Sequence, residues 1–153
     1  MAISLLQHGG VAAIGYDADT GERGFLVKLT NCTGGVSVKG TLLAASTAAD
    51  SEVILEANEY DTIAVCQGAG VAEGSQMWCW MPGSVCQVLF KDSVAATRGN
   101  IALAADTDGR AIDVTNPGGG LPGTDTHFKE VGHVLASATA GTNVLVLIAL
   151  HTN

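Results

Sequence analysis

The stretch that decides the fold runs from Met77 to Asn100 and reads MWCWMPGSVCQVLFKDSVAATRGN. Side chains alternate along an extended strand, so the two tryptophans of Met77–Met81 share one face and Cys79 shares the other with the methionines. The Pro82-Gly83 turn leads into a second apolar run, Ser84–Phe90. A Pro-Gly pair suits type I or II turns, whereas two-residue hairpin loops favour the primed types, so we expect a loop of about four residues. Two such strands predict the central hairpin of a β-domain.

Outside this stretch, short apolar runs are separated by Gly-rich or polar turns. The expected strands are Gly24–Leu29, Val36–Leu43 with a bulge at Gly40, Glu52–Ala57 paired with Asp61–Cys66, Asn100–Ala104, Arg110–Val114, Lys129–Leu135 and Asn143–His151. Ala44–Ser51 and Ala95–Gly99 are the two places where a short helical turn fits. About ten short strands and at most one short helix predict an all-β chain, folded as a single small β-barrel or sandwich-like domain.

The N-terminal residues 1–20 are Gly-rich and weakly patterned, and their strong apolar residues are Ile3, Leu5 and Leu6. Two interpretations stay open: a frayed terminus or edge strand, or an arm that docks on a neighbouring molecule. We therefore divide the chain into an N-terminal arm or edge segment, residues 1–20, and a barrel-like domain, residues 21–153.

Composition points to a chain that hides part of its surface in partners. Of the 153 residues, 47% are hydrophobic and 14% are charged, against a usual charged share of about a quarter. The net charge is −8 and the seven Lys and Arg residues are scattered, whereas binding to nucleic-acid phosphates needs basic residues in clusters. We expect no nucleic-acid partner.

The chain is expected to be made in the cytoplasm and to stay off membranes. Its N-terminus has no basic segment followed by a signal-length apolar run, and the longest apolar run, Val144–Leu150, is too short to cross a bilayer. The four cysteines are therefore expected to be reduced. All but Cys32 lie in apolar runs and are expected to act as small buried hydrophobic residues.

Candidate chemical sites are weak. His127, Glu130 and His133 lack a metal-binding pattern, because on a strand over Lys129–Leu135 the side chain of Glu130 points away from His133. The Asp pairs in Asp17–Gly21 and Asp106–Gly109 fit Asx turns better than calcium loops.

The remaining motifs do not predict catalysis either. Gly68–Gly74 is a loop between strands with the wrong spacing for a dinucleotide fingerprint. No G-x-S-x-G elbow is present. We expect no enzyme activity, no metal and no cofactor.

Two groups of large side chains are candidates for protein contacts. Trp78 and Trp80 are expected in the core or in a subunit interface, although paired tryptophans also stack sugars or bases. The loop Thr115–Phe128 is longer than a compact domain needs unless it contacts something or moves. Its large apolar residues are Leu121, Pro122 and Phe128, and together with the tryptophans and the N-terminal apolar residues they form the predicted interface set.

Several motifs, taken in order, resemble the small capsid decoration proteins (cement or head-fibre-type) of tailed bacteriophages. They are Asp61–Cys66 (DTIAVC), Gly70–Gly74 (GVAEG), Trp78–Leu89 (WCWMPGSVCQVL), Ala95–Asn100 (AATRGN), Asp108–Ala111 (DGRA), Glu130–Leu135 (EVGHVL) and Gly141–Leu147 (GTNVLVL). The resemblance extends from about Gly24 to His151. The family's usual Gly-Asp after the Ala-rich turn is Gly99-Asn100 in this chain.

The resemblance implies a barrel-like domain that is added to the outer surface of a capsid in the virion, often as a trimer, and that ties neighbouring major capsid subunits together. It implies that the partners are the major capsid protein and further copies of this chain. A different class of function, a carbohydrate- or receptor-binding β-module on the virion, would use the tryptophans and the long loop as its binding surface.

Overall fold

The computed structural model describes residues 4–8, 11–57, 62–105, 108–115 and 129–148, and within them the chain is all-β with no helix. The strands are β1 (Ser4–His8), β2 (Ala12–Tyr16), β3 (Arg23–Asn31), β4 (Leu42–Ala45), β5 (Glu52–Leu55), β6 (Thr62–Cys66), β7 (Gln76–Trp80), β8 (Val85–Leu89), β9 (Ile101–Ala104), β10 (Ala111–Val114), β11 (Glu130–Val134) and β12 (Asn143–Ile148). The predicted all-β class is confirmed, and neither Ala44–Ser51 nor Ala95–Gly99 is helical.

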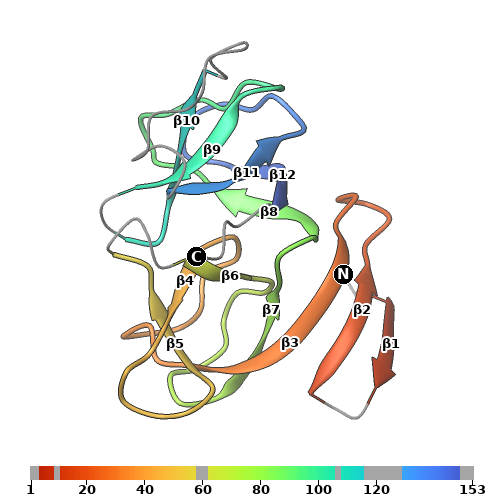
Figure 1. Cartoon of the computed structure of the whole chain (residues 1–153), viewed down its shortest axis with the longest axis vertical. Helices are drawn as coiled ribbons and strands as arrows, with labels where there is room; N and C mark the ends of the chain where they lie inside the picture. Colours follow the sequence, from red (N-terminus) through yellow and green to blue (C-terminus); the bar gives the residue numbers. More distant parts are fainter. Residues whose placement is uncertain (1–3, 9–10, 58–61, 106–107, 116–128, 149–153) are drawn as a thin grey trace.

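Five strands close into a barrel, seen in the lower part of Figure 1. Their order around the barrel is β3, β5, β4, β6 and β7, and β7 pairs again with β3. Only the β3–β5 pair is parallel among these neighbours. Every strand of the barrel contributes to the apolar interior, which includes Leu29, Leu43, Val53, Ala64, Cys66, Met77 and Cys79. The predicted barrel is therefore present.

The last five strands form a curled sheet in the upper part of Figure 1, in the order β8, β12, β11, β9 and β10. A bridge between Phe90 and Ala111 brings β10 back to the end of β8, and the Lys91 N–H donates to the Ala111 carbonyl at 3.0 Å. Among the described strands, one residue pair, Arg23 with Val85, joins the curled sheet to the barrel.

The two-faced apolar pattern of Met77–Met81 has a structural reason. Met77 and Cys79 fill the barrel, while Trp80 faces outward into the larger cluster that joins the barrel to the curled sheet. Trp78 packs against that same larger cluster. The predicted alternation is confirmed, and β7 needs two apolar faces because it lies between two cores.

The predicted hairpin over β7 and β8 is wrong. The connecting loop has the expected four residues, Met81–Ser84, and the Ser84 N–H donates to the Met81 carbonyl at 3.2 Å. However, β7 and β8 pair with β3 and not with each other. The Phe25 N–H donates to Ser84 Oγ at 2.9 Å. The loop therefore continues along the same edge of β3 and takes the chain out of the barrel and into the curled sheet.

Two further strand predictions are wrong for similar reasons. Strand β4 begins at Leu42, because the preceding segment is held as a loop: Ser37 exchanges hydrogen bonds with Gly68 and Val71. Gly40 lies in a turn with φ of 85° and is not a bulge. β5 and β6 are not paired with each other, since β4 lies between them.

The described part of the predicted Asp106–Gly109 turn, Asp108-Gly109, docks the curled sheet on the barrel. The Leu42 N–H donates to the Gly109 carbonyl at 2.7 Å, and the Gly109 N–H donates to the Glu56 carbonyl at 3.0 Å. A Cβ at position 109 would lie 2.7 Å from the Leu42 carbonyl oxygen, and φ there is 63°. Glycine is therefore required twice, by the left-handed backbone and by the close approach.

Replacing Gly109 by alanine is expected to lower the free energy of unfolding more than the same change at Gly99. Both glycines have positive φ, but a Cβ at Gly99 meets nothing within 4 Å. Backbone strain alone costs about 1–2 kcal/mol, and overlap with a packed backbone adds about 1–3 kcal/mol. Urea denaturation of G109A and G99A measures the difference, and equal losses would contradict the docking role of the turn.

Candidate interaction surface

The N-terminal hairpin carries a large exposed apolar surface. Strands β1 and β2 extend the sheet outward from β3, in red to orange at the right of Figure 1. Ile14 on β2 is directly opposite Phe25 on β3. Their exposed fractions are 46% and 57%, and that of Tyr16, two residues from Ile14, is 54%. We call these three residues the apolar face.

The sequence of the hairpin explains why these side chains are on the outside. Ala13 and Gly15 alternate with Ile14 and Tyr16 and are buried, so β2 turns its small residues toward the molecule. On β3 the inward residue is Leu26, which is buried opposite Trp80. Ile14, Tyr16 and Phe25 have the opposite parity and are exposed, whereas Leu29, further along the same face of β3, packs into the barrel. Cross-strand pairs such as Ile14 and Phe25 are close enough to form one surface.

The apolar face continues toward an open edge. The backbone register pairs Leu6 of β1 with Ile14, and β1 pairs only with β2 among the described strands. At the other end, Tyr16 is opposite Arg23, whose guanidinium donates to the Gly21 carbonyl at 3.0 Å. An apolar surface beside an unpaired strand edge is a common docking surface for another protein chain.

The predicted interface residues lie in different environments. Trp80 is 0% exposed, so it is a core residue of the single chain. Trp78 is half-buried, and the Lys28 ammonium lies over its ring, 5.0 Å from the centroid. Leu5 and Leu6 lie on β1, of which the backbone is described. Ile3, Leu121, Pro122 and Phe128 lie outside the described residues.

The tryptophans do not form an open stacking surface. Sugar recognition by tryptophan needs an accessible ring face, but Trp80 is enclosed and a lysine covers part of Trp78.

The sequence analysis did not predict the apolar face. The signal for it is the alternation of Ile14 and Tyr16 with Ala13 and Gly15 in an otherwise weakly patterned segment.

The predicted geometry around His133 is wrong. Glu130 Oε1 lies 3.3 Å from His133 Nε2, so both side chains lie on the same side of β11. A register shift between Glu130 and Gly132 inserts Val131 as an extra residue, and a bulge reverses the alternation beyond it. His127 lies outside the described residues. Within the described residues no three His, Cys, Asp or Glu side chains are grouped to hold a metal ion.

Other predicted loops have structural roles. Asp17 Oδ1 accepts hydrogen bonds from the Asp19 and Thr20 N–H groups at 3.0 and 3.3 Å, which confirms an Asx turn. Burial raises the pKa of Asp17, but these hydrogen bonds together lower it by more than burial raises it. The pKa of Asp17 is therefore below its ordinary value. The predicted Gly68–Gly74 loop connects β6 and β7.

Among the described residues there is no helix that could span a bilayer.

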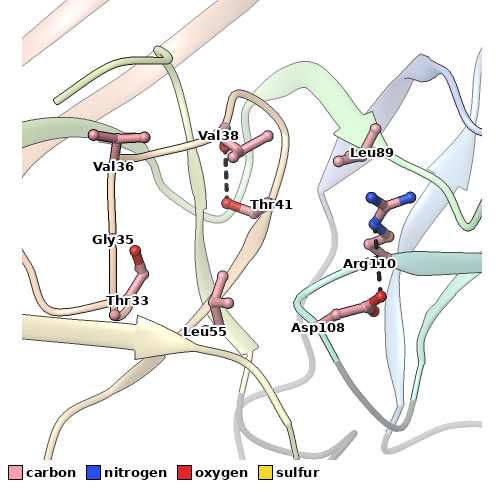
Figure 2. A pocket seen from close by; sticks show the side chains of 10 residues that line it. Thr33, Gly35, Val36, Val38, Thr41, Leu55, Leu89, Asp108 and Arg110 are labelled. Atoms are coloured by element: carbon pink, nitrogen blue, oxygen red, sulfur yellow. Dashed lines mark hydrogen bonds and ion pairs between the residues drawn. The ribbon is translucent and has the colours of Figure 1, made fainter.

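A pocket of about 250 Å³ lies where the barrel meets the curled sheet. Figure 2 shows its two sides: the loop before β4, with Val36 and Val38, faces Leu89 and Arg110 of the curled sheet, and Leu55 lies below. Its complete lining is Thr33, Gly34, Gly35, Val36, Val38, Thr41, Leu55, Leu89, Asp108 and Arg110. This lining contains no aromatic ring, so the pocket does not have the stacking surface that sugar binding by aromatic residues requires.

The cysteines offer no activated nucleophile. Cys66, Cys79 and Cys86 are buried and Cys32 is half-buried, all of them free. Burial raises the pKa of the three buried thiols, that of Cys79 to about 12. Burial and the nearby Glu52 carboxylate raise the pKa of Cys32. A reactive cysteine needs a lowered pKa, so these thiols act as small apolar side chains, as predicted for the three in strands.

Comparisons with known proteins identify a solved structure with a similar fold. No family model and no curated protein matches the sequence. A solved structure that does match is the head fiber gp8.5 N base of bacteriophage phi29, with a TM-score of 0.57, 17% sequence identity, and coverage of 84% of this chain and 98% of that chain. The resemblance to head-fibre-type decoration proteins is thus confirmed at the level of the fold.

Alkylation of the native protein is expected to modify Cys32 alone, and slowly. Its raised pKa keeps the thiol neutral to a higher pH than in a free cysteine, so the rate should begin to rise at higher pH. Mass spectrometry after iodoacetamide treatment across a pH series gives the modified positions, and unfolded protein serves as the control in which all four cysteines react. Rapid native modification of Cys66 or Cys79 would contradict the described core.

Proposed function

We propose that this protein is a structural, non-enzymatic component of a phage virion that binds the outer surface of the capsid. The observation that carries the proposal is the apolar face on a fold similar to that of a phage head fiber base. Neither is sufficient alone, because a fold supports many functions and an apolar surface marks an interface without naming the partner.

The apolar face supports a contact between protein chains. Ile14, Tyr16 and Phe25 are each about half exposed, and fully burying a large apolar side chain contributes about 1.5–3 kcal/mol. One such face gives a weak contact. Several faces in one oligomer act together through effective concentration, so that an oligomer can hold a repetitive shell tightly.

The proposed partners are the major capsid protein and further copies of this chain, most simply in a trimer. A head-to-tail interface with three-fold symmetry closes on itself and forms no filament. Charged residues are 14% of the chain, and depletion of charge is typical of interface cores. By bridging neighbouring capsid subunits, the oligomer would stabilise the shell. No cofactor, nucleic acid or membrane is part of this proposal.

The N-terminal segment, residues 1–20, is proposed as the docking arm, distinct in role from residues 21–153. Strands β1 and β2 occupy half of it, and β1 has an edge that no other described strand covers. An edge strand of this kind can accept a strand from another chain through main-chain hydrogen bonds. The arm would therefore combine strand pairing with burial of the adjoining apolar face.

Replacing Ile14 and Phe25 by serine is expected to weaken shell binding and self-association together, because both side chains are exposed and contribute little to the core. Each surface change should alter stability by about 0.5 kcal/mol or less. Co-sedimentation with mature shells lacking this protein, together with native mass spectrometry, measures both effects. I63S is the matched control, an exposed isoleucine on β6. Undiminished binding by I14S/F25S would contradict the role of the apolar face.

Deleting Met1–Gly10 is expected to abolish or strongly reduce decoration while residues 21–153 remain folded. The deletion removes β1 and its open edge but leaves the barrel strands intact. Circular dichroism checks the fold, and the heat resistance of decorated shells measures the function. Full shell binding and full heat protection by the shortened protein would show that the arm is dispensable.

A further inference from the structure

We propose that the pocket between the Thr33–Thr41 loop and the Asp108–Arg110 turn receives a lysine side chain of a partner protein. The choice of a partner protein rests on the proposed function, because the lysine would belong to the surface on which this protein docks. The chemistry of the pocket rests only on the residues that line it, and it can be tested without a shell.

The walls of the pocket suit an aliphatic stem. Val36 and Val38 are exposed on one side, and Leu55 and Leu89 are half-buried on the others. Figure 2 shows these four side chains around the pocket, with Arg110 below Leu89 and Asp108 next to Arg110. The volume of about 250 Å³ is below the range of about 300–1,000 Å³ that is usual for drug-sized ligands. One long side chain is an occupant of suitable size.

The Thr33–Thr41 loop offers hydrogen-bond acceptors, because several of its N–H and O–H donors are already used. The Gly34 and Gly35 N–H groups both donate to Glu73 Oε2 at 3.1 Å. The hydroxyl of Thr33 donates to Asn31 Oδ1 at 2.7 Å. The hydroxyl of Thr41 donates to the Val38 carbonyl at 2.9 Å. With their protons used inside the loop, the two hydroxyl oxygens keep lone pairs for a donor.

The charges of the opposite wall favour a cation. Arg110 donates to Asp92 Oδ1 at 2.5 Å, and its Nε lies 3.7 Å from Asp108 Oδ2. Asp108 and Arg110 line the pocket, and Asp92, which pairs with Arg110 from outside the lining, brings the formal charge of the three side chains to about −1. The Asp108 side chain is 53% exposed, so a carboxylate oxygen is accessible from the pocket. An arriving anion would meet this carboxylate, whereas an ammonium group would be attracted to it.

Lysine combines the two required properties. Its four-carbon stem packs along apolar surface while the ammonium group stays at a polar rim, and its three N–H donors match separate oxygen acceptors. The net charge of this chain is −8, so a basic partner surface is also favoured at long range. An aliphatic slot that ends in acceptors and a carboxylate fits this side chain better than a neutral or acidic one.

The position of Asp108 is fixed by the fold. Its φ is 69°, in the left-handed region that Asp and Asn tolerate better than most residues. The following residue, Gly109, is held between Leu42 and Glu56 by backbone hydrogen bonds. The carboxylate is thus carried on a turn anchored to the barrel, and Asn can replace Asp108 with the backbone unchanged.

The test is an NMR titration of the full-length protein with N-acetyl-lysine methylamide. We expect saturable shifts of the amides of Thr33–Val38 and Asp108–Arg110, and weaker binding as salt is added. The neutral norleucine analogue and the glutamate analogue should not bind measurably. D108N should weaken lysine binding about two- to fivefold, the range for an exposed ion pair, and D19N, which removes an equal charge on the turn after β2, should leave it unchanged.

Three outcomes would overturn the inference: no saturable shift at these amides, equal binding of the norleucine or glutamate analogue, or equal affinity of D108N and the parent protein. The two proposals fail separately. If the lysine analogue binds through Asp108 but the protein does not bind shells, the proposed function fails and the pocket chemistry stands. If shells bind and the lysine analogue does not, the pocket inference alone fails.

Discussion

The structure depends on the way strand β3 uses both of its hydrogen-bonding edges. Along Arg23–Val27 it pairs with β2, along Leu26–Thr30 with β7, at Thr30 and Asn31 with β5, and at Arg23 with β8. The strand therefore closes the barrel, holds the N-terminal hairpin and meets the curled sheet. One face of β3 packs into the larger core cluster through Leu26. The opposite face packs into the barrel at Leu29, whereas Phe25, nearer the start of the strand on that face, is 57% exposed.

Local sequence patterns predicted the strands better than their partners. Alternation gave the two faces of Met77–Met81, and turn chemistry gave the four-residue loop that follows. The pairing of β7 with β8 was wrong because a short loop is compatible both with a hairpin and with a chain that continues in one direction, and β3, far away in the sequence, lies beside both strands. Val36–Thr41 alternates like a strand, yet contacts of Ser37 with the Gly68–Val71 loop hold it as a loop.

The candidate surface was harder to predict than the fold. The sequence singled out Trp78 and Trp80 by size, but Trp80 lies at the junction of barrel and curled sheet and is buried there. Ile14 and Phe25 meet across a strand pair whose register is not readable from either segment alone. The bulge at Val131 likewise reversed the direction expected for Glu130. Register and bulges are properties of strand pairs, and a single sequence reports them weakly.

The protein has two surfaces that can contact other proteins. One is the apolar face, and the other is the acceptor-lined pocket between the barrel and the curled sheet. A cryo-EM reconstruction of mature shells incubated with the protein tests this account most directly. The account predicts added density on the outer surface, into which the barrel and curled sheet fit with Ile14 and Phe25 buried against another protein chain. Shells without added density, or bound protein with this face turned to solvent, would contradict it.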